Sequence, residues 1–453
     1  MTFLHLASSC RVWGLVLCAV MSAAVSSLAG EANPRGPVAE TFEEAWAKMK
    51  PFDGTRAPGG VDTSTVDGKI IVGYQGWFFT PGDGSGRGWV HFAGGNFSDG
   101  KATVDMWPDM SEATPAERYE TGFKYPDGSP ATVFSSYNPL TVNRHFKWMA
   151  DYGIDGAFVQ RFISGTRNPK SFDANNAVLD NVRRAANANG RTFAVMYDLS
   201  GMRPAEALTI ISKDWSALVD RMQITRDPSY QRHHGKPLVI LWGVGFGRKY
   251  TTAEISEAVD FLQHDPKYGG NAVMLGTPSA WRTGKGDAQK DPDLEALIKK
   301  VDIVSPWSVN RYKSPEAFQR CLDSYGKEDL AWCNENKVGY MPVIFPGFSW
   351  NNLMDTRGRD ARKEAVPRGD GTFFWSQGNG WIKAGAKMIY IAMFDEIDEG
   401  TAIFKVSGNP PPPGKSSFVT NEGMPPDQYL WLAGQLGRTL RKEIPSQDAV
   451  PKR

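Results

Sequence analysis

The amino-acid sequence predicts an α/β protein folded as a (β/α)8 TIM barrel, with an inserted loop after the first strand and a C-terminal helical extension. Three observations lead to this prediction. Eight short apolar segments occur between residues 70 and 394, and helical patterns lie between them. Of the 453 residues, 41% are hydrophobic and 22% are charged. This composition excludes a disordered, collagen-like or coiled-coil chain.

The expected strands are short apolar runs, as in parallel sheets buried on both faces. They cover residues 70–74, 154–159, 192–197, 238–242, 272–275, 302–305, 340–345 and 388–394. Helical spacing of apolar residues is found around 146–150, 178–186, 255–262 and 294–298, and a helix-like stretch surrounds Trp381. Gly153 and Gly190 are suitable residues to end the first two helices. Strands that alternate with helices run parallel, and eight of them favour a closed barrel.

The expected domain organisation has four parts. Residues 1–29 are a signal peptide, and residues 30–66 are an N-terminal strap that packs through Phe42, Ala45, Trp46 and Met49. The catalytic barrel spans 67–407, and its insert at 79–137, rich in Gly, Pro and Asp, is expected to fold over the barrel mouth. Residues 408–453 contain a stiff run of prolines and then a helix with an apolar stripe formed by Tyr429, Leu432, Leu436 and Leu440.

The first 29 residues have the pattern of a cleavable secretory signal. Arg11 precedes an apolar run from Val12 to Val25, and Ser27 and Ala29 are small residues at positions −3 and −1, so we expect cleavage after about Ala29. The apolar run is shorter than the roughly 20 residues that a spanning helix requires. The sequence therefore predicts a secreted or periplasmic protein with no membrane span.

The chain contains four cysteines, and two of them leave with the signal peptide. The remaining pair, Cys321 and Cys333, predicts one disulfide in an oxidising compartment, and two free buried thiols are the alternative. Neither C-x-x-C nor H-E-x-x-H occurs, so no zinc or other metal site is expected. His233 and His234 precede the strand at 238–242, at the bottom of the barrel, where a stabilising role is expected.

The charge balance argues against a nucleic-acid partner. Lys and Arg number 51 and Asp and Glu number 50, which leaves no basic excess to bind a phosphate backbone. The glycines at 243–247 lack the G-x-G-x-x-G register, and the glycine-rich segment 82–88 has no following Lys-Ser/Thr. We therefore expect a monomer that needs no cofactor.

The functional site of a TIM barrel forms at the C-terminal ends of its strands. In this sequence those ends carry many aromatic and hydrogen-bonding residues, a combination that stacks on sugar rings and binds their hydroxyl groups. The residues expected to bind a carbohydrate substrate are Tyr74, Trp77, Gln160, Arg161, Tyr197, Asp198, Trp242, Trp281, Trp307, Asn310, Trp350 and Asp395. The alternative for any single tryptophan is that it caps the barrel core. Trp89 and His91 lie in the inserted loop. Each is expected either to reach the barrel mouth or to have a role at the surface or in the core.

An acidic run follows the eighth strand. Asp395, Glu396, Asp398 and Glu399 lie within five residues, so at least one pKa should be raised by its neighbours. Glycosidic cleavage uses such a pair, with a protonated acid at the leaving oxygen and an ionised partner near the anomeric carbon. Glu396 and Glu399 are the expected catalytic residues. An exposed acidic loop and a calcium-binding turn are the alternatives.

The stretch from Phe394 to Thr401, F-D-E-I-D-E-G-T, resembles the strand-eight motif F/W-N-E-W-x-E-G-T of glycoside hydrolase family 99, the endo-α-mannosidase type, and of its family 71-like relatives. Three further segments resemble the same family in the same order. They are V-G-Y-Q-G-W at 72–77, Y-G-I-D-G at 152–156, and the strand-seven region 342–350. The resemblance covers residues 68–405, which is the whole expected barrel.

The resemblance implies roles for three residues. Glu396 would deprotonate the substrate 2-hydroxyl, which attacks the anomeric carbon to give an epoxide-type intermediate. Glu399 would act as general acid and then base, so that configuration is retained, and Tyr74 would help to position the sugar. Two positions depart from the motif: Asp395 stands where the family usually has Asn, and Ile397 where it has Trp. The second change is expected to alter the wall of the −1 subsite.

The sequence as a whole predicts a secreted glycoside hydrolase that cleaves a poly- or oligosaccharide through Glu396 and Glu399. A conventional retaining mechanism on xylosides or arabinosides uses the same residue types and remains an alternative. The second alternative is a carbohydrate-binding barrel without catalytic activity.

Overall fold

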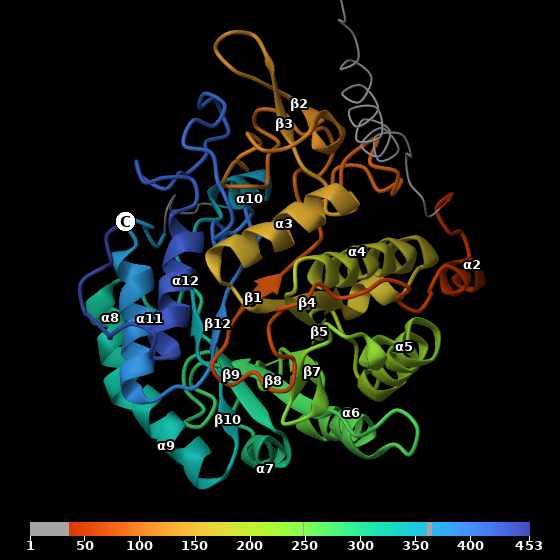
Figure 1. Cartoon of the computed structure of the whole chain (residues 1–453), viewed down its shortest axis with the longest axis vertical. Coiled ribbons are helices and arrows are strands. Elements are labelled where there is room, and N and C mark those ends of the chain that lie inside the picture. The colour runs from red at the N-terminus through yellow and green to blue at the C-terminus, as the bar shows by residue number, and fades with distance from the viewer. Residues whose placement is uncertain (1–35, 248, 360–364) are drawn as a thin grey trace, which may run out of the picture. The chain divides into compact units, whose positions relative to one another are not determined.

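The computed structural model describes residues 36–247, 249–359 and 365–453, and its central feature is a ring of parallel strands (Figure 1). The strands are β1 (Ile70–Tyr74), β4 (Gly156–Phe162), β5 (Thr192–Asp198), β7 (Lys236–Trp242), β8 (Ala272–Pro278), β9 (Ile303–Trp307), β10 (Gly339–Tyr340), β11 (Val343–Ile344) and β12 (Ile389–Ile391). β10 pairs with β9 and β11 pairs with β12, so the single segment 339–344 joins both neighbours and closes the ring. The predicted (β/α)8 barrel is confirmed.

Helices alternate with these strands and surround the barrel (Figure 1). They are α2 (Phe42–Ala47), α3 (Pro139–Tyr152), α4 (Pro169–Ala188), α5 (Ala207–Met222), α6 (Thr252–His264), α7 (Pro292–Lys300), α8 (Pro315–Cys321), α9 (Lys327–Glu335), α10 (Asn351–Thr356), α11 (Thr372–Ala384) and α12 (Gln428–Leu440). α3 shows how the sequence sets such bounds: the Asn138 side chain accepts a hydrogen bond from the Leu140 amide, and Gly153 ends the helix with φ 75°.

Several strands end at residues other than expected at the C-terminal end of the barrel. β8 continues to Pro278 and β9 to Trp307. β4 continues to Phe162, so Gln160 and Arg161 lie inside the strand and not beyond it. β12 ends at Ile391, although the apolar run continues to Phe394. The Phe394 amide still donates a hydrogen bond to the Gly73 carbonyl at 2.7 Å, so the chain stays attached to β1 after the ladder ends.

The insert at 79–137 has its own small core. It contains the 3-10 turn η1 (Pro115–Glu117) and an antiparallel hairpin, β2 (Tyr119–Lys124) and β3 (Pro130–Val133). Aromatic rings of the insert pack against one another and against Phe418 from the C-terminal segment, with Trp107 and Phe418 centroids 5.0 Å apart. Further rings of this cluster are Phe92, Phe97, Phe123 and Phe134.

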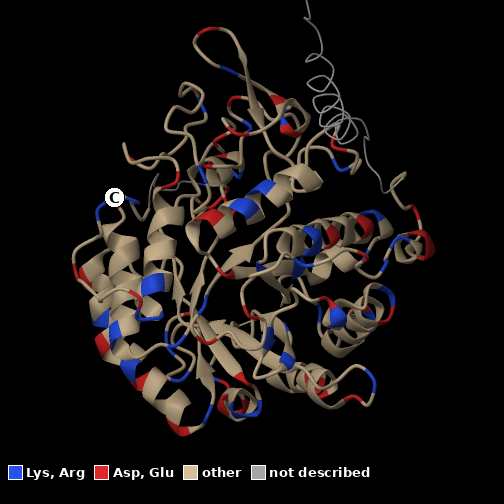
Figure 2. Ribbon diagram, viewed as in Figure 1, with Lys and Arg blue, Asp and Glu red and all other residues tan. Residues whose placement is uncertain are grey.

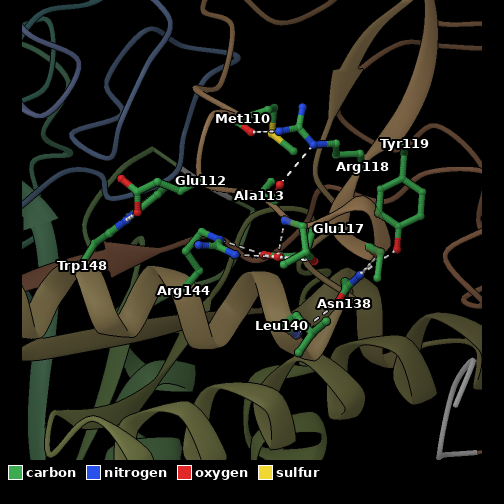
Figure 3. A network of polar contacts seen from close by, with 12 residues as sticks. Met110, Glu112, Ala113, Glu117, Arg118, Tyr119, Asn138, Leu140, Arg144 and Trp148 are labelled. Carbon is green, nitrogen blue, oxygen red and sulfur yellow. Dashed lines mark hydrogen bonds and ion pairs between the residues drawn. The ribbon is translucent and has the colours of Figure 1, made fainter. Parts of the chain in front are cut away.

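A network of polar contacts joins the insert to α3 (Figure 3). The buried Glu117 carboxylate accepts hydrogen bonds from Arg144 at 2.9 and 2.6 Å and from the Thr114 amide and hydroxyl. On the same helix, the Trp148 indole donates to Glu112 at 2.9 Å. These contacts fix the insert to the barrel by hydrogen bonds as well as by apolar packing.

Both flanking segments pack on the barrel helices. Phe42 of α2 contacts Phe172 of α4, with ring centroids 5.7 Å apart. α12 lies beside α3 and α11 (Figure 1). Gly434 permits this approach, because a Cβ there would lie 2.0 Å from the Tyr152 carbonyl oxygen. Residues 38–453 accordingly form one compact unit, whereas the expected signal peptide lies outside the described residues.

The expected disulfide is not formed, because Cys321 and Cys333 are free thiols. Cys321 ends α8 and Cys333 lies in α9, and the π-helical turn 322–326 joins these two helices without a break. Twelve residues along one helix span about 18 Å at 1.5 Å per residue. A disulfide requires Cα atoms less than about 7 Å apart, so the two sulfurs cannot meet.

Charged residues of both signs are spread over the helices and loops (Figure 2). This distribution agrees with the net charge of +1. Within the described ranges, no helix is long and apolar enough to cross a membrane.

The Glu117–Arg144 pair allows a test of how the insert is held. Arg144→Met should lower the free energy of unfolding by about 3 kcal/mol, because it leaves a buried carboxylate without its cationic partner. Lys147→Met, on the same helix, removes an exposed ion pair with Asp151 and should cost less than about 1 kcal/mol. Urea denaturation of both variants measures the difference. Equal losses of stability would contradict this account of the network.

Candidate active site

Glu396 and Glu399 follow β12 at the C-terminal end of the barrel. The Glu396 side chain is buried, whereas Glu399 is partly exposed. The Thr401 and Ala402 amides both donate to the Glu396 carbonyl at 3.1 Å, which folds residues 396–402 into a compact turn. This turn carries both expected catalytic residues.

The Glu396 carboxylate is held by two hydrogen bonds. Gln75, directly after β1, donates its amide N–H to Oε1 at 2.6 Å, and the Thr401 hydroxyl donates to Oε2 at 2.7 Å. Both donors favour the ionised form and fix the plane of the carboxylate. Neither residue was assigned a role from the sequence, although Thr401 belongs to the strand-eight motif and Gln75 follows a strand end.

The two glutamates influence each other's charge. Burial raises the pKa of Glu399 to about 7, and the nearby charge of Asp398 acts in the same direction, opposed by Arg357. Burial, followed by the charges of Glu399 and Asp398, raises the pKa of Glu396 well above its usual range. Near neutral pH the pair therefore retains a proton that ordinary carboxylates would have lost. One protonated and one ionised carboxyl group is the combination that acid–base catalysis requires.

Asp398 links the acidic turn to the insert. Its Oδ2 lies 3.0 Å from His91 Nδ1, and its buried Oδ1 has no hydrogen-bond partner within the protein. His91 stacks on Trp77 with a centroid distance of 3.7 Å and an interplanar angle of 6°. The sequence left two positions open for His91, the barrel mouth and the surface or core. The structure places its ring at the barrel mouth.

Asp395 has a structural role and not the expected contact with substrate. Its side chain is fully buried and accepts hydrogen bonds from the Gln75 amide at 2.7 Å and the Gly76 amide at 2.9 Å. Burial raises its pKa to about 7, against the effect of these two amides. Within the described residues, the carboxylates of the acidic run are not grouped closely enough to count as a possible metal site.

Ile397 is fully buried as well, so its side chain does not line a subsite wall. Its carbonyl oxygen accepts the backbone N–H groups of Asp105 and Met106 from the insert, at 2.8 and 3.1 Å. The expected change in the −1 subsite therefore does not arise from direct contact between this residue and a sugar.

Four residues expected to bind substrate face the helices instead. Tyr74 is fully buried, with its hydroxyl 2.9 Å from His145 Nδ1. Arg161 forms a buried ion pair with Asp214 of α5, and the Tyr197 hydroxyl donates to the same carboxylate at 2.7 Å. Trp281 is buried against Trp332, with ring centroids 5.1 Å apart. Successive residues of a strand point to opposite faces, and these four lie on the outer face of the barrel or beyond it.

Trp242 and Trp307 are partly exposed at the ends of β7 and β9, with ring centroids 5.2 Å apart. Trp350 is also partly exposed and packs on Phe348. Trp77 stacks on His91 and on Phe162, so its ring is already packed against protein side chains. The partly exposed tryptophans at the strand ends are thus Trp77, Trp242, Trp307 and Trp350.

The remaining expected residues, Gln160, Asp198 and Asn310, differ in position. Gln160 points into the barrel, where its Nε2 lies 3.4 Å from the Tyr390 hydroxyl. The carboxylate of Asp198 accepts the Ser200 amide at 2.7 Å. Asn310 is partly exposed with φ 58°, and its Oδ1 has no partner within the protein. Tyr390, which received no role from the sequence, occupies the barrel interior near Gln160.

Arg368 stabilises the turn formed by residues 396–402, the glutamate turn. This fully buried guanidinium donates to the carbonyl oxygens of Gly400 at 2.9 Å and Ala402 at 2.7 Å. Its ring partner is Tyr429 of α12, 4.2 Å from the guanidinium carbon. The C-terminal helix therefore contributes to the position of the two glutamates.

Two comparisons with known proteins gave no match: no family model matches the sequence, and no curated protein matches it. Solved structures do match the fold. A GH99 endo-alpha-mannosidase from Bacteroides thetaiotaomicron aligns with a TM-score of 0.59 and 16% identity, over 83% of this chain and 99% of that one. A second structure of a GH99 endo-alpha-mannosidase from that organism, in complex with BIS-TRIS-propane, gives 0.58 and 15% over the same shares. The chain therefore shares the barrel fold of these endo-alpha-mannosidase structures.

Proposed function

We propose that the protein is a glycoside hydrolase in which Glu396 and Glu399 carry out the chemistry. The observation that carries this proposal is the pair itself. Two carboxyl groups with raised pKa values lie in one turn, at the end of the barrel where TIM-barrel enzymes bind their substrates. The fold shared with endo-alpha-mannosidase structures, and the resemblance of the strand-eight motif, support the same class of reaction.

The two environments suggest different roles. Glu396 accepts two hydrogen bonds that fix the orientation of its carboxylate and act against the effect of burial on its pKa, which suits a base or nucleophile. Glu399 is more accessible and has a pKa of about 7, which suits a group that protonates the leaving oxygen and later activates water. We propose that configuration is retained, with Glu396 acting on the substrate 2-hydroxyl as the resemblance implies. In the conventional retaining alternative Glu396 attacks the anomeric carbon itself.

The substrate we propose is a poly- or oligosaccharide that stacks on the exposed faces of Trp242, Trp307 and Trp350. An α-mannoside is the first choice because of the resemblance, and xylosides or arabinosides are the alternative. We also propose that the protein is secreted, since its first 29 residues have the pattern of a cleavable signal.

Single substitutions of the two glutamates test this proposal. Glu396→Gln and Glu399→Gln should each lower kcat/KM by at least about 100-fold, the contribution expected of an acid or base catalyst. Release of reducing sugar from a panel of polysaccharides, with products identified by mass spectrometry, measures the effect. Glu295→Gln, at the exposed ion pair with Lys299 on the outer helix α7, is a matched control that should keep full activity. Sugar release that survives both glutamate changes would contradict the assignment, and binding without any cleavage by wild type would favour the non-catalytic alternative.

The pH profile tests the role of Glu399. A general acid must be protonated, so kcat/KM should fall as pH rises, with a midpoint at about 7. Asp398→Asn removes a like charge and should move this midpoint to lower pH, whereas Arg357→Gln removes an opposite charge and should move it to higher pH. Initial rates between pH 4 and 9 measure both shifts. Midpoints that do not move, or that move in the reverse directions, would exclude Glu399 as the titrating acid.

The stereochemistry of the product tests the retaining route. The first sugar released should have the same anomeric configuration as the substrate, because two successive displacements at one carbon restore it. Proton NMR during the first minutes of the reaction, before mutarotation, distinguishes the two anomers. An inverted product would require a different arrangement of acid and base.

A further inference from the structure

The opposite end of the barrel carries a second cluster of titratable side chains. Asp67 lies just before β1, and His233 and His234 lie at the short strand β6 (Arg232–His233), just before β7. Each residue offers one ligand atom, and these atoms all lie within 4.8 Å of one another. Within the described ranges this is the one group of three or more His, Cys, Asp or Glu residues with that geometry. The sequence predicted no metal site, because it contains neither C-x-x-C nor H-E-x-x-H.

The two segments that carry these residues are fixed to each other by their backbones. The Arg232 amide donates to the Thr63 carbonyl at 2.8 Å, and the Gly235 amide donates to the Ser64 carbonyl at 2.9 Å. The Gln231 side chain donates to the Thr63 and Thr65 carbonyls at 3.1 and 3.0 Å. These hydrogen bonds hold the two backbone segments in place. Binding of an ion would therefore need movement of side chains only.

The two imidazoles lie face to face, with ring centroids 3.8 Å apart. His233 is buried, and its Nδ1 lies 3.2 Å from the Thr65 hydroxyl, which fixes the orientation of its ring.

His234 and Asp67 provide the accessible side of the cluster. His234 Nε2 lies 3.3 Å from Asp67 Oδ2, and the two side chains are 69% and 38% exposed, so an ion can enter from solvent. Imidazole nitrogens with one carboxylate are a donor set that suits zinc and its first-row neighbours.

We propose that Asp67, His233 and His234 bind one divalent first-row transition-metal ion, such as Zn2+, with its remaining positions filled by water. The ion would connect the segment before β1 to the β6–β7 hairpin and stabilise the base of the barrel. The site lies at the other end of the strands from Glu396, so this proposal is independent of the proposed catalytic function.

Calorimetric titration with Zn2+ tests the proposal, using the full chain without an affinity tag and after treatment with a chelator. Wild type should bind one ion per chain in a saturable manner. His234→Ala removes an exposed ligand and should weaken binding at least tenfold, and Asp67→Asn should also weaken it. Zn2+ should raise Tm in wild type but not in His234→Ala, because an ion bound only to the folded state stabilises it.

His264→Ala is the matched control, since His264 is an exposed histidine at the end of α6 outside the cluster. It should bind Zn2+ as wild type does. Titration with Co2+ adds a spectroscopic readout, because visible absorption reports coordination by imidazole. The proposal is overturned if wild type shows no saturable binding, if His234→Ala binds as tightly as wild type, or if His264→Ala loses binding to the same extent.

Discussion

The carboxylate of Asp395 makes the contact on which the rest of the candidate site depends. It receives the amides of Gln75 and Gly76 and so joins the chain after β12 to the chain after β1, beyond the last pair of the strand ladder. With its backbone fixed, Gln75 can reach Glu396 with its side chain at 2.6 Å. A carboxylate can receive both amides because each oxygen is an acceptor, whereas Asn offers a single acceptor oxygen. The departure from the resembled motif at this position therefore tightens the junction without adding a group that faces substrate.

Hydrogen bonds of two residues, Asp105 and Arg368, show that segments outside the barrel strands position the glutamate turn. The carboxylate of Asp105, in the insert, accepts the amides of Asn351 and Asn352 at 2.7 and 2.8 Å, at the start of α10. The Asp105 amide donates to Ile397 within the turn. From the other side, Arg368 holds the carbonyl oxygen of Gly400. Segments from the insert, from the region after β11 and from the C-terminal part of the chain thus meet at one turn, which explains why the barrel alone does not define the site.

The sequence predicted the barrel well because buried parallel strands leave a clear apolar signal, and it predicted the glutamates because they stand directly after a strand. It did not predict which strand-end residues face the mouth. Position along a strand gives the end of the barrel, but successive side chains alternate between its two faces. Gln160 points inward, whereas the side chains of Tyr74, Arg161 and Tyr197 point to the helices. The hydrogen bonds from Arg368 to carbonyl oxygens could not be predicted from the sequence, because every residue has a backbone carbonyl that can accept such a bond.

The raised pKa values have a thermodynamic cost that the insert helps to offset. Asp395 and Glu399 have pKa values near 7 when folded and about 4 when unfolded, so the folded state binds more protons between these values. Their contribution to stability is therefore present below about pH 4 and is lost as pH rises through about 7. Glu117 behaves in the opposite way: burial acts to raise its pKa, but the hydrogen bonds from Arg144 and Thr114 lower it overall, so it contributes stability above its unfolded pKa. The ion pair that anchors the insert therefore contributes in full across the pH range in which Asp395 and Glu399 lose their protons. The insert that supplies Asp105 and His91 to the site thus keeps this anchor when the acidic turn becomes ionised.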